Sequence, residues 1–97
     1  MRKITREAYQ AFINKEPFKK SNTEVQVSDT GDVVQLLLYN NAIAKQVNGV
    51  LSITSAGYPT NTTKERLNAF TNVRIHQAKG LWYLNDEYWD GEWIIIY

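Results

Sequence analysis

The segment AGYPTNTTKERLNAF (residues 56–70) separates two strand-rich regions of a 97-residue chain. A glycine and a proline at its start end the preceding strand pattern, because these two residues are the strongest local breakers of regular structure. The following TTKE (residues 62–65) matches a helix capping box, in which the threonine hydroxyl and the glutamate carboxylate each accept a backbone hydrogen bond. The segment therefore predicts a short helix over about residues 62–71, which either contacts a partner or closes a core.

Upstream of this segment, the sequence predicts one helix and one antiparallel meander. Apolar residues at helical spacing indicate a helix over about residues 5–15, with Thr5 as its N-cap and Pro17 shortly after its end. The spacing of apolar residues then changes to every second position. Turn residues, including an Asn48-Gly49 hairpin signal, divide the strands that we expect over about residues 23–55.

Downstream, alternating residues and short turns predict a second antiparallel meander over about residues 73–97. A chain of this length makes one domain rather than two. The sequence therefore predicts a single α+β domain over residues 1–97, with two short helices and two antiparallel meanders.

The composition excludes several kinds of chemistry. The chain has no cysteine, so a disulfide, a thiolate nucleophile and a cysteine-based zinc site are all excluded. The single histidine, His76, has no serine in a nucleophile-elbow motif to act with, and the acidic residues near the C-terminal end stand at predicted turns. We therefore expect no catalytic residues, no metal, no cofactor and no enzymatic activity.

The sequence also predicts no association with a membrane. No apolar run approaches the ~20 residues that a spanning helix needs. The N-terminal residues are basic but have no apolar segment behind them, as a signal peptide would require. We expect a cytoplasmic protein.

Charge is unevenly distributed, although the net charge is only +1. Basic residues gather in residues 1–20 and 64–79, whereas residues 80–97 carry acidic side chains and no basic ones. A helix followed by a basic β-hairpin resembles the recognition helix and wing of winged-helix proteins, although VLSITSA (residues 50–56) reads as strand where those proteins have a helix. We predict DNA or RNA binding by the helix and the 73–84 hairpin, through Thr62, Lys64, Arg66, Arg74 and Lys79. The alternative is an ordinary solvated surface.

A second functional hypothesis rests on the aromatic residues near the C-terminal end. Trp93 and Tyr97 share one face of a predicted strand, and isoleucines occupy the other face. A strand with two apolar faces is either central in its sheet or in contact with another chain. The alternative function is therefore protein binding, either to a host protein or to a second copy, through Trp89, Trp93 and Tyr97. Burial of these residues in the core is the competing explanation.

Three blocks of the chain carry a resemblance to a known family. They are GYPTNTTKERLN (residues 57–68), YLN (residues 83–85) and WDG (residues 89–91). In these blocks the chain resembles a family of small uncharacterised proteins encoded by bacteriophages. The resemblance implies a bacteriophage origin, and it implies no activity and no site residues.

Overall fold

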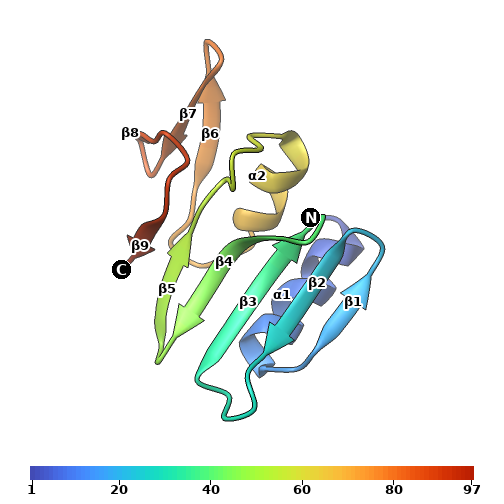
Figure 1. The fold of residues 1–97 in the computed structure, drawn as a ribbon. Coiled ribbons are helices and arrows are strands. Elements are labelled where there is room, and N and C mark those ends of the chain that lie inside the picture. The colour runs from blue at the N-terminus through green and yellow to red at the C-terminus, as the bar shows by residue number, and fades with distance from the viewer.

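The computed structural model describes residues 1–97 and contains two helices and two antiparallel sheets, which confirms the predicted α+β class (Figure 1). Neither helix has the length and apolar composition that crossing a membrane requires. Along the chain the elements are α1 (Lys3–Asn14), β1 (Phe18–Lys20), β2 (Thr23–Val27), β3 (Val33–Leu38), β4 (Asn41–Val47), β5 (Val50–Ile53), α2 (Asn61–Leu67), β6 (Ile75–Ala78), β7 (Leu81–Leu84), β8 (Glu87–Tyr88) and β9 (Ile94–Ile96).

The first helix begins two residues earlier than predicted. Arg2 is its N-cap residue and makes no side-chain capping bond, so the predicted capping role of Thr5 is wrong. Thr5 is instead 1% exposed, because it lies on the face of α1 that packs inward. At the other end Lys15 adopts the left-handed conformation, with φ 55°, and its N–H returns to the carbonyls of Ala11 and Phe12.

The large sheet has six strands in the order β1-β2-β3-β4-β5-β9, and the small sheet has three in the order β6-β7-β8. The predicted second meander over residues 73–97 is therefore wrong in its last strand, because β9 pairs with β5 of the large sheet. Ile94 lies opposite Ile53, and Ile96 lies opposite Leu51. Leu51 and Ile96 both pack against the core, so apolar contact accounts for this placement. Strand β1, which was not predicted, forms one border of the sheet.

The core lies between α1, α2 and one face of the large sheet. Along β3 the side chains of Val34, Leu36 and Leu38 are buried, while the alternate residues point to the opposite, open face. Phe12 of α1 meets Phe70, which follows α2, edge to face at 4.9 Å between ring centroids. The inner face of the small sheet extends the same apolar cluster. Both sheets thus keep one face for the core and leave the other exposed.

Candidate functional site

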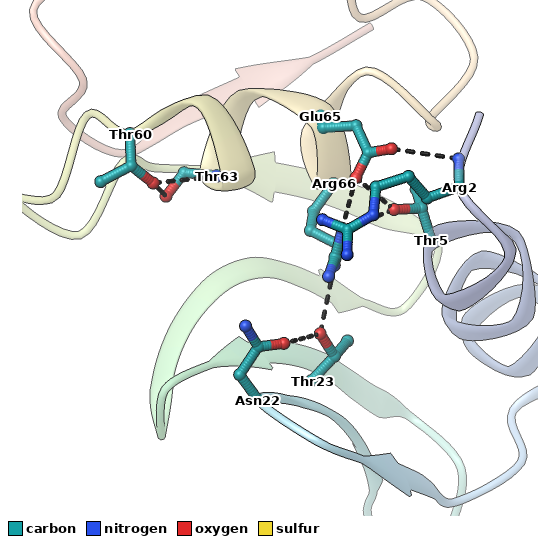
Figure 2. A network of polar contacts seen from close by, with 8 residues as sticks. All are labelled: Arg2, Thr5, Asn22, Thr23, Thr60, Thr63, Glu65 and Arg66. Carbon is teal, nitrogen blue, oxygen red and sulfur yellow. Dashed lines mark hydrogen bonds and ion pairs between the residues drawn. The ribbon is translucent and has the colours of Figure 1, made fainter.

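Arg66, one of the predicted nucleic-acid contacts, is buried between α2, α1 and β2 (Figure 2). Only 2% of its surface is exposed. Its Nε donates to Thr23 Oγ1 at 3.1 Å, and its Nη1 donates both to Thr5 Oγ1 at 2.6 Å and to Glu65 Oε1. The guanidinium group is therefore occupied inside the protein, and the prediction that Arg66 contacts a nucleic acid is wrong.

The start of α2 also differs from the predicted capping box. The N-cap is Thr60, whose side chain accepts a hydrogen bond from the Thr63 N–H at 3.1 Å, so the helix starts at Asn61 rather than at residue 62. Glu65 does not fold back to the start of the helix. Its carboxylate accepts instead from Thr5 Oγ1 at 2.6 Å and from the Arg2 N–H at 3.1 Å (Figure 2). The helix ends at Leu67, four residues before the predicted boundary.

The charges of this network depend on one another. Burial by itself raises the pKa of Glu65, but the Thr5 hydroxyl, the Arg2 N–H and the charges of Arg66 and Arg2 together lower it below its usual value. Burial is also the main cause that lowers the pKa of Arg66, and the neighbouring carboxylate opposes this effect. The network therefore stabilises the fold through an ionised Glu65.

We predict an acid-sensitive step in stability from this arrangement. A carboxyl group whose pKa is lowered by folding contributes stability that is fully present above its unfolded pKa of about 4.3 and is lost as the pH falls through the folded value. The urea midpoint of the wild type should therefore stay nearly constant from pH 7 to about pH 5 and fall below about pH 4. Glu65→Gln should be less stable than the wild type at pH 7, and its stability should fall less than that of the wild type on acidification. Urea titrations across this range measure both effects.

Glu7 provides the matched control for this prediction. The pKa of Glu7 is also lowered, chiefly by its hydrogen bond to Lys20, but both partners of this 3.0 Å ion pair lie at the surface. Exposed ion pairs contribute little to stability. Glu7→Gln should therefore follow the wild-type pH profile closely. If Glu65→Gln also followed that profile, Glu65 would have no stabilising role.

The remaining predicted contacts do not form one surface. Thr62 and Lys64 lie on α2 and are half-buried, and the Lys64 Nζ is 3.5 Å from Gln77 Oε1 on β6. Arg74 directly precedes β6 and is exposed, as is Lys79 in the β6–β7 turn. Side chains alternate along a strand, so Arg74 lies on the opposite face of the hairpin from Gln77 and Lys64. The structure therefore separates Lys64 from Arg74.

A row of rings on the outer face of the small sheet was not identified from the sequence; His76 and Tyr88 are exposed, and Tyr83 between them is half-buried. His76 lies opposite Tyr83, and Tyr83 lies opposite Tyr88. The His76 and Tyr83 rings are stacked, with centroids 5.3 Å apart and planes 14° apart, and Tyr88 meets Tyr83 edge to face at 6.4 Å. We call the surface formed by these three rings, with Arg74 and Lys79 beside them, the aromatic face. The two-residue Lys79-Gly80 turn sets the register that pairs His76 with Tyr83. The sequence therefore contained the information needed to predict that these two rings lie side by side.

The opposite face of the small sheet explains why these rings remain outside. Ile75, Trp82 and Leu84 point inward and are 5–6% exposed, so they fill the space beneath the sheet. Trp89 packs beside Trp82, with ring centroids 6.2 Å apart, and its indole N–H donates to the Glu92 carbonyl at 3.0 Å. Trp89 is 6% exposed, so its predicted role at a protein interface is wrong.

The other two predicted interface residues are accessible. Trp93 is 49% exposed and Tyr97 is 95% exposed. Trp93 borders a hollow on the open face of the large sheet, together with Val47 and Val50. No group of three or more His, Cys, Asp or Glu side chains is arranged to hold a metal ion.

The blocks that carry the family resemblance hold structural residues. The Asn68 side chain binds both backbone groups of Ile75. Its Oδ1 accepts from the Ile75 N–H at 2.7 Å, and its Nδ2 donates to the Ile75 carbonyl at 3.0 Å. Asn85 accepts from the Arg74 N–H and donates to the Asn72 carbonyl. Leu67 and Thr63 are almost fully buried. The segment over residues 56–70 therefore closes the core and fixes the start of the small sheet.

Comparison with known families confirms the bacteriophage origin that the resemblance implies. A family model described as Kyanoviridae Gp96 protein matches residues 1–95. No curated protein and no solved structure matches the chain. Because the match covers nearly the whole sequence, the chain belongs to the Kyanoviridae Gp96 protein family, a family of bacteriophage proteins.

Proposed function

We propose that the protein binds single-stranded nucleic acid on the aromatic face of the small sheet. The observation that carries this proposal is the row formed by the stacked His76–Tyr83 pair and Tyr88, which is 62% exposed. Nonspecific single-strand binders combine exposed aromatic rings, on which bases stack, with basic residues that follow the phosphate backbone. The aromatic face has both components on one surface.

The position of the basic residues supports this proposal. Arg74 lies at the base of the β6–β7 hairpin and Lys79 lies at its tip, so the two cations stand at opposite ends of β6, with His76 between them. The row of rings crosses the strands from β6 to β8. In Figure 1 the tip of this hairpin projects away from the large sheet. Asp86, in the β7–β8 turn, is an acidic neighbour and limits the expected affinity.

A single strand fits this surface better than a duplex. Bases in a single strand expose their flat faces, and stacking on an aromatic side chain contributes about 1–3 kcal/mol per base. The bases of a duplex are already stacked on one another, so only the phosphates would remain for contact. The two cations alone would then supply weak binding that falls steeply with salt.

We expect a short oligothymidylate to bind, and Tyr83→Ala and Tyr88→Ala each to weaken binding about tenfold, because each removes one stacking surface. In a plot of log affinity against log salt concentration, each phosphate contact of a single strand contributes about −0.7 to the slope, so two contacts should give a slope of about −1.4. Arg74→Gln or Lys79→Gln should reduce that slope by about half. Fluorescence anisotropy with single-stranded DNA, duplex DNA and RNA, at about 50 and 150 mM salt, measures these effects.

Lys64 of α2 supplies the control for this experiment, because it approaches the hairpin from the opposite face, at Gln77. Lys64→Gln should leave the affinity within about twofold of the wild type, since long-range effects of exposed charges are screened within ~10 Å. A loss at Lys64→Gln with no change at Tyr83→Ala would move the binding surface back to α2. No binding at low salt would reject the nucleic-acid function.

A further inference from the structure

Strand β9 forms the other border of the large sheet, and the Tyr97 carbonyl just beyond it accepts a hydrogen bond from the Asn72 side chain at 3.1 Å. It is the last strand in the order β1-β2-β3-β4-β5-β9, and no strand pairs with its outer edge (Figure 1). Its three residues are all isoleucine, and Ile94 and Ile95 are 41% and 45% exposed. A free edge with apolar side chains is a template for pairing with another chain.

The opposite border of the sheet shows the usual protection. Strand β1 follows Pro17 and carries Lys19 and Lys20, both of which are exposed. Proline and lysine on an edge strand prevent pairing with a second sheet, because one lacks an N–H and the other must keep its charge hydrated. No proline and no charged side chain occurs between Trp93 and Tyr97. The same sheet therefore blocks one edge and leaves the other available.

We propose that two copies of this chain associate through antiparallel pairing of their β9 strands, around a two-fold axis at Ile95. In this register Trp93 faces the partner's Tyr97, and Ile94 faces the partner's Ile96. Ile95 has the same parity as Trp93, so the rings and the central isoleucines gather on the open face of the sheet. Aromatic pairs directly across two strands are stabilising.

A second copy suits this edge because the segment is self-complementary. Every contact across the axis joins one apolar side chain to another, and no like charges meet in residues 93–97. Two-fold pairing is also the commonest arrangement of protein oligomers, since one surface then serves both partners. The result is one continuous sheet built from the six strands of each copy.

The exposed area predicts how strong this association is. Trp93 and Tyr97 expose 49% and 95% of their surfaces, which amounts to roughly 300 Å² at about 150–250 Å² per aromatic side chain. Ile94 and Ile95 add a smaller area. A standard specific interface takes about 800 Å² from each partner. The β9 interface lies below that size, so we expect a reversible dimer with a micromolar dissociation constant.

The register can be tested by cysteine crosslinking, because the chain has no cysteine of its own. Facing residues of antiparallel strands have Cα atoms about 4.5–5.5 Å apart, which is within the range that a disulfide spans. Under mild oxidation Ile95→Cys should form a covalent dimer at least tenfold faster than Lys19→Cys, which places the thiol on the protected edge. Equal rates would overturn the proposal.

Sedimentation of the untreated protein is the second measurement. The wild type should shift from monomer to dimer between about 1 and 200 µM, whereas Ile95→Lys should remain monomeric over this range. Tyr97→Lys should raise the dissociation constant several-fold, and its site is too exposed to affect the core. A monomeric wild type, as expected if β9 serves only a host protein, would overturn the proposal. Dimerisation unchanged by both variants would overturn it as well. Neither result depends on nucleic-acid binding.

Discussion

Arg66→Ala is expected to destabilise the protein by about 3–5 kcal/mol, because it removes one member of a buried ion pair. The truncation also leaves the hydroxyls of Thr5 and Thr23 without their donor and opens a cavity where the largest fully buried side chain stood. Domains of this size have total stabilities of about 5–15 kcal/mol. The loss should be visible as a large fall in the urea midpoint.

Two further variants separate the causes of this loss. Arg66→Lys keeps the positive charge but cannot bind Thr23, Thr5 and Glu65 at once, so it should lose about 1.5–3 kcal/mol, the strength of a hydrogen bond to a charged group. Lys64→Ala, two residues earlier on the same helix, should change stability by no more than about 0.5 kcal/mol. If Arg66→Ala lay within about 1 kcal/mol of the wild type, the network would not be structural.

Gly91→Ala should destabilise the protein by about 2–5 kcal/mol. This value is the sum of two costs: about 1–2 kcal/mol for a side chain at positive φ, and about 1–3 kcal/mol for overpacking. Gly91 has φ 87°, and a Cβ atom added there would lie 2.3 Å from Ser55 Oγ and 3.0 Å from Ser55 Cβ. The Gly91 carbonyl also accepts from the Ser55 N–H at 2.8 Å and from the Thr54 hydroxyl at 2.7 Å. These bonds hold the segment before β9 against the end of β5.

Gly49 provides a matched control for Gly91. It has nearly the same backbone angle, φ 85°, but no atom lies within 4 Å of an added Cβ. Gly49→Ala should therefore have only the backbone cost of about 1–2 kcal/mol. Ser55→Ala in the Gly91→Ala background should recover part of the stability, because it removes the closest clashing atom. Equal losses at the two glycines, measured by urea denaturation, would show that contact with Ser55 does not matter.

Local patterns predicted the elements well where the determining residues are close in sequence. The Asn48-Gly49 pair joins β4 to β5, and Lys79-Gly80 joins β6 to β7, as their turn chemistry requires. The end of α1 at Asn14 follows from the nearby proline. In each of these cases one short segment contains the whole signal.

The placement of β9 and of Arg66 could not be predicted in the same way. Ile94–Ile96 is apolar on both faces, so its local pattern is the same whichever sheet it joins, and the choice depends on a distant strand. Arginine is mostly an exposed residue, and Arg66 is buried because Thr5 and Thr23, 61 and 43 positions away, accept its N–H groups. The basic charge of the helix therefore suggested a surface that the fold does not present.

The most direct test of the proposed function is an NMR titration of the ¹⁵N-labelled protein with a short oligothymidylate at low salt. Single-strand binding on the aromatic face predicts amide shifts that concentrate at His76, Tyr83 and Tyr88 and in the turn at Lys79, with α2 unaffected. The same titration of Tyr83→Ala should require about tenfold more ligand for an equal shift. Shifts centred on α2 or on β9, or no shifts at all, would contradict the account.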